Sequence, residues 1–201
     1  MSRSISANAY CVGNDVKALE IMPTRFKSSN ALSDAELAKA AFADLDPAFS
    51  AKALAGEFAI VVAGVNFGGG GKTVEGPVFA LRGAGVRLVI AESFARFFLR
   101  NAINNAFPVL VCPGITRAVQ TGQPLEVDLE SARITNVSTG EVLNGTPLSA
   151  TALQIVDAGG LVPYARKKLA QRLADKAAAG EAVGNDATTR VPGRGTVAQD
   201  H

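Results

Sequence analysis

Three short apolar runs, separated by segments of helical character, constrain the fold of this sequence more than any other feature. The runs cover residues 58–64, 85–91 and 109–112 and are rich in valine, isoleucine and leucine. Runs of this length, bounded by glycine or proline, are typical of strands buried on both faces. Between them, residues 77–83 begin with proline and end with glycine, and residues 94–106 carry apolar side chains at helical spacing. This alternation predicts an α/β fold with parallel strands.

The pattern changes after Pro113, where short segments alternate between apolar and polar residues. Alternation of this kind is typical of strands with one exposed face, and it predicts three further strands at residues 125–129, 133–137 and 141–143. Earlier in the chain, Ser33 and Glu36 have the spacing of a capping box, which predicts that a helix starts there. The sequence therefore predicts a mixed sheet rather than a purely parallel one.

The C-terminal part predicts helices followed by a tail. Residues 149–158 predict a helix that ends at two glycines, and the Ala-rich segment 164–179 predicts another that ends at Gly180. Residues 181–201 have no apolar period and predict a flexible tail. We therefore expect one α/β domain over residues 1–165, and a C-terminal helix with a disordered tail over residues 166–201.

The composition excludes several classes of protein. Apolar residues make up 48% of the 201 residues, which excludes a disordered chain. The net charge of +2 is too balanced for a dedicated nucleic-acid-binding protein. Cys11 and Cys112 lack metal-ligand spacing and the one histidine is His201, so we expect no metal site in this chain. No apolar run is long enough to cross a membrane and no signal peptide is visible, which predicts a cytoplasmic protein.

The segment from Asn66 to Thr73 contains four consecutive glycines followed by a lysine and a threonine. Successive glycines allow several backbone N–H groups to point at one anion, and Lys72 and Thr73 add a charge and a hydroxyl. Three interpretations are open: a nucleotide phosphate loop, a flexible turn with a solvated lysine, and an anion-binding loop for a carboxylate. The first is the weakest, because Asn66 stands where the phosphate loop has glycine and Gly76-Pro77 interrupts the next helix.

Four stretches, in order along the chain, together resemble the small subunit of 3-isopropylmalate dehydratase, the swivelling domain of the aconitase superfamily. The most specific is IAESFARFFLRNAINN, which is close to the family's IAxSFAxIFxRNAINN. The resemblance spans about residues 10–168. The four stretches are the helix of residues 36–49 with its DLDPAF ending, VAGVNFG at 62–68, the long stretch at 90–105, and the AGGL helix at 155–164.

This resemblance implies a β/β/α swivelling domain that docks on a large catalytic subunit. In the family, that partner holds a [4Fe-4S] cluster that polarises a substrate hydroxyl, and the small subunit completes the cleft. No cofactor is then expected on this chain itself. The reaction moves water across a 2-hydroxy di- or tricarboxylic acid, so the implied activity is that of a hydro-lyase in leucine biosynthesis, inactive as a lone chain. The expected partners are the large subunit and a small carboxylic acid, with neither nucleic acid nor membrane.

The sequence departs from the family at its catalytic loop. The family's glycine loop runs NFGCGSSREH, in which a serine acts as base and the arginine grips a substrate carboxylate. Here Gly71, Lys72 and Thr73 stand in place of the serines and arginine, or Lys72, Thr73 and Val74 in the alternative alignment. A lysine offers a point charge rather than the bidentate fork of arginine. The upstream motif DNIDTDxIIP has also lost its second and third acids, whereas Pro23 and Arg25 remain from the stretch that follows.

The candidate site residues follow from this comparison. The catalytic candidates are Lys72 and Thr73, and the substrate-binding candidates are Gly69, Gly70, Gly71 and Arg25. Two functional hypotheses follow: a divergent dehydratase small subunit, or a swivelling domain that has lost catalysis and acts as a binding or regulatory module. A nucleotide-binding protein is a weaker third.

Residues around the most specific stretch also carry structural expectations. Phe94, Phe97 and Phe98 are expected in the core by their spacing, and Cys112 is expected to be a small buried apolar residue. The asparagines at the end of the same stretch, such as Asn105, are expected to end a helix rather than to contact substrate.

Overall fold

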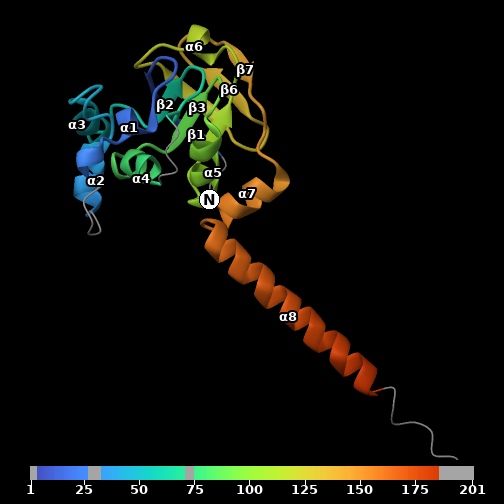
Figure 1. Cartoon of the computed structure of the whole chain (residues 1–201). Coiled ribbons are helices and arrows are strands. Elements are labelled where there is room, and N and C mark those ends of the chain that lie inside the picture. The colour runs from blue at the N-terminus through green and yellow to red at the C-terminus, as the bar shows by residue number, and fades with distance from the viewer. Residues whose placement is uncertain (1–3, 27–32, 71–74, 186–201) are drawn as a thin grey trace, which may run out of the picture. The chain divides into compact units, whose positions relative to one another are not determined.

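The computed structural model describes residues 4–26, 33–70 and 75–185 (Figure 1). The chain divides into two compact units, Met1–Tyr164 and Ala165–His201. The first unit contains the sheet and the candidate site, and in the described part of the second unit the chain continues as helix α8 (Leu161–Asn185). Within the described ranges, no helix combines the length and the apolar character that a membrane span requires.

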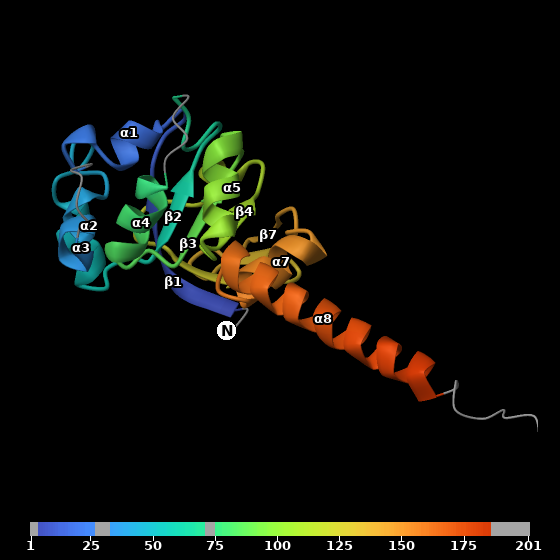
Figure 2. The same ribbon diagram turned by 60° about the horizontal axis from the view of Figure 1, so that its bottom comes forward.

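The first unit is built on a seven-stranded mixed sheet with the order β4-β3-β2-β1-β5-β6-β7. Figure 2 labels its strands β1 to β4. Strands β1 to β4 are parallel, whereas β5, β6 and β7 pair antiparallel. The predicted α/β class and the mixed sheet are therefore confirmed. The strands are β1 (Ser4–Cys11), β2 (Ile60–Ala63), β3 (Leu88–Ala91), β4 (Val109–Val111), β5 (Pro124–Asp128), β6 (Arg133–Asn136) and β7 (Val142–Asn144).

Strand β1 joins the parallel and antiparallel parts of the sheet. Its first half, from Ser4 to Asn8, pairs antiparallel with β5. Its second half, from Ala9 to Cys11, pairs parallel with β2. One strand therefore changes partners along its length, so that its last residues point toward the same edge as the ends of β2, β3 and β4.

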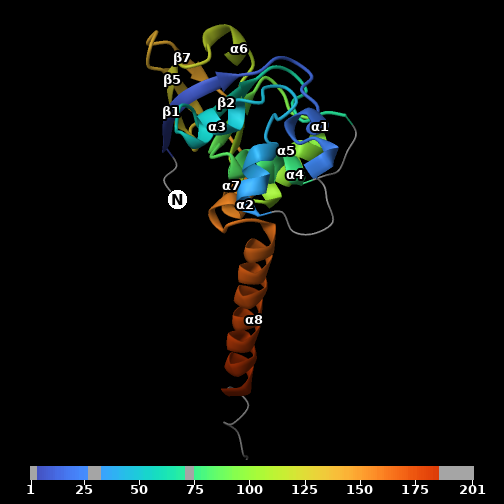
Figure 3. The same cartoon turned by 90° about the vertical axis from the view of Figure 1, so that its left-hand side faces the viewer.

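Helices cover both faces of the parallel strands. They are α1 (Ala18–Ile21), α2 (Asp34–Ala40), α3 (Phe49–Leu54), α4 (Gly76–Gly83), α5 (Arg96–Asn104), α6 (Ile115–Ala118) and α7 (Ala150–Asp157), with the 3-10 turn η1 (Thr24–Phe26). Figure 3 shows α4 and α6 on opposite sides of β1 and β2.

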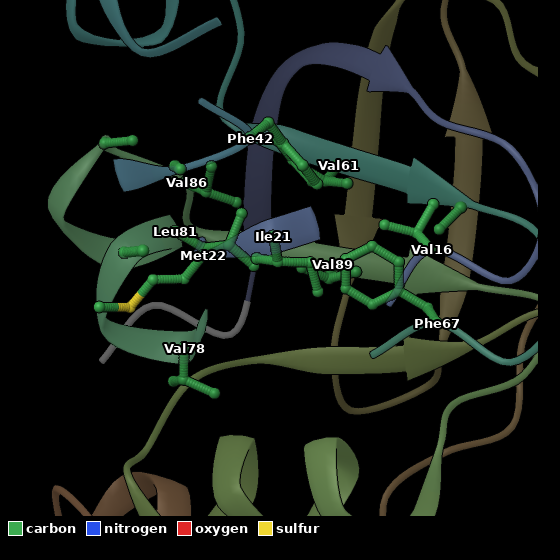
Figure 4. Close-up of a cluster of buried hydrophobic side chains, with 14 of the residues drawn as sticks. Val16, Ile21, Met22, Phe42, Val61, Phe67, Val78, Leu81, Val86 and Val89 are labelled. Carbon is green, nitrogen blue, oxygen red and sulfur yellow. The ribbon is translucent and has the colours of Figure 1, made fainter. Parts of the chain in front are cut away.

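Alternate residues of each buried strand belong to two separate cores. Val61 and Val89 pack with residues of α1, α4 and α5, and part of this cluster is drawn in Figure 4. The intervening residues, such as Ile60 and Leu88, pack with α6 and with the apolar face of β5 and β6. Burial on both faces explains why the sequence of these strands is continuously apolar rather than alternating.

Several predicted boundaries are confirmed and others are corrected. The capping box at Ser33 is present, because the Ser33 N–H donates to Glu36 Oε2 at 2.9 Å. Asn105 forms the C-cap of α5, and Cys112 is buried, both as predicted. Helix α8 begins at Leu161 and continues to Asn185, so the expectation that Gly180 ends it is wrong. A helix-interior glycine costs only about 1 kcal/mol and does not by itself stop a helix.

The predicted start of the tail and the predicted burial of Phe97 both differ from the structure. The tail predicted from residue 181 begins too early, since α8 extends past it, and residues 186–201 lie outside the described residues. Phe97 is 45% exposed, so its predicted place in the core is wrong, whereas Phe98 is buried. Neighbouring helical residues differ by about 100° in direction, and only Phe98 of this pair faces the sheet.

Candidate functional site

The carboxyl ends of the parallel strands meet at one edge of the sheet, and three loops leave the sheet there. These are residues 12–17 after β1, residues 64–70 after β2 and residues 92–95 after β3. In open sheets with parallel strands, ligands bind beyond this edge. The two isolated bridges Lys17–Gly69 and Phe67–Phe94 continue the parallel pairing past the strand ends, so the loops remain in register with one another.

Hydrogen bonds fix the β1 loop to the β2 loop. The Asp15 N–H donates to the Val65 carbonyl at 2.8 Å, and the Val65 N–H donates to Asn14 Oδ1 at 3.1 Å. Asn66 Nδ2 donates to Asp15 Oδ1 at 2.9 Å. Asp15 and Asn66 both have positive φ, at 54° and 57°, a conformation that Asp and Asn tolerate better than most residues. Hydrogen bonds from specific side chains and backbone groups therefore fix the two loops to each other.

Ser93 connects the β2 loop to the β3 loop. The Asn66 N–H donates to Ser93 Oγ at 2.9 Å, and the Phe67 N–H donates to the Ser93 carbonyl at 3.0 Å. Phe67 is fully buried and meets Phe98 edge-on, with ring centroids 5.0 Å apart. The entrance to the glycine loop is thus anchored to the core through an aromatic side chain.

Two glycines at this edge have no room for a side chain. A Cβ built on Gly64 would lie 1.8 Å from Asn14 Oδ1, which is the atom that accepts the Val65 hydrogen bond. A Cβ on Gly68 would lie 2.4 Å from Phe98 Cβ, and Gly68 also has φ of +81°. Glycine at these two positions therefore follows from close packing.

A cavity of about 490 Å³ opens beside the end of β1. The residues that line it include apolar ones, such as Val16 and Leu45, as well as acidic and basic ones. The charged and polar residues of the lining include Asn14, Asp15, Lys17 and Glu20. A cavity of this size and mixed character suits a small polar molecule that carries an apolar substituent.

Tyr10 forms one side of this cavity. Burial and the hydrogen bond that its hydroxyl donates to Asp46 Oδ2, 2.8 Å away, raise the pKa of Tyr10 well above its ordinary value. Its ring meets Phe49 and Phe58 with centroids 4.8 Å apart in both cases. Tyr10 is therefore neutral in the ordinary pH range and acts as a rigid wall.

The structure places the predicted site residues in different surroundings. Gly69 and Gly70 lie in the β2 loop, where the Gly69 carbonyl accepts a hydrogen bond from the Ala18 N–H at 2.9 Å. Gly71, Lys72 and Thr73 lie outside the described residues.

Arg25 is engaged with other residues of this chain. Its guanidinium pairs with Asp44 at 2.6 Å and lies over the Phe26 ring. It does not line the cavity, so its predicted role in substrate binding stays a prediction.

Sequence reasoning did not single out the β1 loop as a source of site residues. Asn14, Asp15 and Lys17 all line the cavity, yet none was among the predicted site residues. The missed signal was β1 itself, where polar and apolar residues alternate from Ser4 to Ala9 as they do on a strand with one exposed face. Once β1 is recognised as a parallel neighbour of β2, its carboxyl end must meet the glycine loop.

The donor atoms of this chain do not fit an iron–sulfur cluster. Such clusters are held by several cysteine thiolates, and the sequence has two cysteines. Burial raises the pKa of the Cys11 thiol, and burial together with the charge of Glu92 raises that of Cys112. In the described part of the chain, no three His, Cys, Asp or Glu side chains are grouped as metal ligands.

Comparisons with known proteins identify the family. A profile of the aconitase C-terminal domain matches residues 16–112. The isopropylmalate/citramalate isomerase small subunit of Methanocaldococcus jannaschii is 42% identical over 171 residues, which covers 85% of this chain and 99% of the relative. The chain belongs to the family of 3-isopropylmalate dehydratase small subunits. A second member, from Methanosarcina acetivorans, is 43% identical over 168 residues and is matched over its entire length.

The fold of the family agrees with the topology described above. The crystal structure of a 3-isopropylmalate dehydratase from Methanocaldococcus jannaschii superposes with a TM-score of 0.77 at 31% sequence identity. That match covers 86% of this chain and 99% of the other. The resemblance seen in the sequence is therefore confirmed. The relatives named here are all enzyme subunits, and they give no support to the alternative of a non-catalytic module.

Proposed function

We propose that this chain is the small subunit of a two-subunit hydro-lyase that acts on a 2-hydroxy di- or tricarboxylic acid. The observation that carries the proposal is that the chain covers the small subunits it matches almost completely. A cavity beside the end of β1, at the carboxyl edge of the sheet, supports it. A large subunit of the isopropylmalate dehydratase type would cover this site. The [4Fe-4S] cluster would belong to that partner and would polarise the substrate hydroxyl.

The residues of this chain would bind and orient the substrate. The reaction removes a proton from the carbon beside a carboxylate and a hydroxide from the neighbouring carbon, and the two leave as water. Lys72 and Thr73 remain our candidates for contact with a substrate carboxylate, and they lie outside the described residues. A lysine there would supply charge without bidentate geometry. The rigid frame of Asn14, Asp15 and Asn66 supports the proposal, because it would hold the glycine loop in place.

Co-expression with a large subunit that carries three cluster cysteines tests the proposal. We expect a stable complex that interconverts an unsaturated dicarboxylate and its hydrated form, and Lys72→Ala should lower turnover by about 10²-fold. Isopropylmalate, citramalate and citrate-like acids should each be assayed. A complex that forms, carries its cluster and leaves all these acids unchanged would refute the proposed function.

A further inference from the structure

The β1 loop presents a lysine to the cavity at a position that faces the glycine loop. Lys17 forms an isolated parallel bridge with Gly69, and the next residue, Ala18, donates its N–H to the Gly69 carbonyl at 2.9 Å. Lys17 is one of the residues that line the cavity of about 490 Å³. The backbone that carries Lys17 is therefore fixed against the loop that our proposed function places at the substrate.

The stem of Lys17 lies beside Gly70. A Cβ built on Gly70 would be 3.4 Å from Lys17 Cβ, 3.6 Å from its Cγ and 3.9 Å from its Cδ. Gly70 has φ of +92°, so a residue with a side chain would be strained there as well as crowded. The bare glycine thus leaves a path along which the lysine stem extends, and the ammonium can lie at the cavity while the stem covers the loop.

The acids around Lys17 are held by other donors. Asp15 Oδ1 accepts from Asn66 Nδ2 at 2.9 Å, and Glu20 Oε2 accepts from the Lys17 backbone N–H at 2.6 Å. Within the described ranges the Lys17 ammonium takes part in no ion pair. The carboxylates of Asp15 and Glu20 are oriented by these bonds, whereas Lys17 is exposed, lines the cavity and has no ion-pair partner among the described residues.

The positive charge of Lys17 is a departure from the sequence pattern of the family at this position. In the upstream motif that the family carries, the position of Lys17 is an acid, and the glycine loop that follows has an arginine that this chain lacks. The chain has therefore gained a positive charge on the β1 loop, while the glycine loop carries Lys72 in place of the bidentate arginine. These two changes lie on loops joined by the Lys17–Gly69 bridge.

We propose that Lys17 binds a carboxylate of the substrate and so adds, from the β1 loop, a second anion-binding charge to the one that Lys72 would supply. The proposal rests on the proposed function and names the group recognised: one carboxylate of a small 2-hydroxy dicarboxylic acid. Because an ammonium is a point charge, the contact tolerates a range of orientations that a guanidinium fork would not.

Steady-state kinetics of the assembled two-subunit enzyme test this role. Lys17→Ala should raise KM by about tenfold while kcat changes little, since a contact made equally in the ground and transition states contributes to binding alone. Lys17→Arg should recover most of the affinity, and Lys17→Asp should raise KM further than alanine does. Lys52→Ala on the exposed face of α3 is the matched control and should match the unaltered enzyme. A KM for Lys17→Ala equal to that of the control would overturn the proposal.

A chemical labelling experiment separates this proposal from the proposed function. Lysine acylation is followed by peptide mapping on the same complex, with and without 2-isopropylmalate or malate. We expect the dicarboxylate to slow the acylation of Lys17 by about tenfold and to leave Lys52 unchanged. This readout does not depend on turnover, so an inactive complex with protected Lys17 refutes the reaction but retains the anion site. Equal labelling of Lys17 with and without either acid refutes the site itself.

Discussion

Replacing Gly68 with alanine tests whether the entrance to the glycine loop is fixed by close packing. The added Cβ would lie 2.4 Å from Phe98 Cβ and Cγ, far inside van der Waals contact. Phe98 cannot retreat freely, because its ring stacks with Phe94 at 5.9 Å and meets Phe67 edge-on at 5.0 Å. The residue would also have to hold φ near +81°.

The two penalties can be estimated separately. A side chain in the left-handed region costs about 1–2 kcal/mol, and overpacking a well-filled core costs about 1–3 kcal/mol. Their sum predicts that Gly68→Ala lowers the free energy of unfolding by about 2–5 kcal/mol. At about 2–4 °C per kcal/mol for a domain of this size, the melting temperature should fall by roughly 4–20 °C.

Gly122→Ala is the matched control. Gly122 has φ of +89°, and among the described residues no atom lies within 4 Å of its added Cβ. This variant should therefore show the backbone penalty alone, about 1–2 kcal/mol. Urea unfolding of both variants, followed by circular dichroism, gives the difference that belongs to the Phe98 contact. If Gly68→Ala is no more destabilising than Gly122→Ala, the close approach of Gly68 to Phe98 does not limit the side chain at the loop entrance, and the packing argument is refuted.

Two further predictions concern the rim of the site and its tyrosine wall. Phe97 is 45% exposed on α5, next to Phe98, and Val65 is 41% exposed on the β2 loop. We expect these apolar side chains to be covered by the large subunit, so Phe97→Asp should weaken its binding by about tenfold or more in calorimetry. Val137→Asp, at a residue 51% exposed after β6, should bind as the unaltered chain does, and equal affinities for both variants would contradict this reading. Tyr10→Phe removes a hydrogen bond and should cost about 1 kcal/mol in urea unfolding. Because folding raises the pKa of Tyr10 above the unfolded value of about 10, the stabilisation by Tyr10 is complete below that pH and is lost as the pH rises through the folded-state pKa. Tyr10→Phe should therefore lose less stability than the unaltered chain between about pH 8 and pH 11, and identical losses would refute the argument.

The parallel strands were predictable because their burial is symmetrical. Ile60 and Val61 face different cores, and both cores demand apolar side chains, so the sequence carries a continuous signal. The glycine loop was visible for a related reason, since Gly68 must lie against Phe98. Constraints of this kind determine which residue types occur at each position, so they can be detected in the sequence alone.

The missed features depend on contacts between distant parts of the chain. In β1 polar and apolar residues alternate from Ser4 to Ala9, a pattern that a strand prediction could have used, but its pairing with β2 on one side and β5 on the other depends on distant segments. The loss of acids from the motif around Lys17 was visible in the sequence, but only the structure, through the register against Gly69, places Lys17 beside the glycine loop. Phe97 shows the opposite error, because helical spacing cannot tell which of two adjacent aromatic residues faces a partner.

The divided pairing of β1 has a consequence for how the polypeptide is made. Ser4 is translated well before its partner Asp128, which follows the parallel strands β2, β3 and β4 in the chain. Until then the front half of β1 has an open edge, although its rear half can already join β2. Long-range pairing of this kind slows folding and exposes unpaired edges during synthesis. We therefore expect the nascent chain to depend on chaperones until β5 emerges.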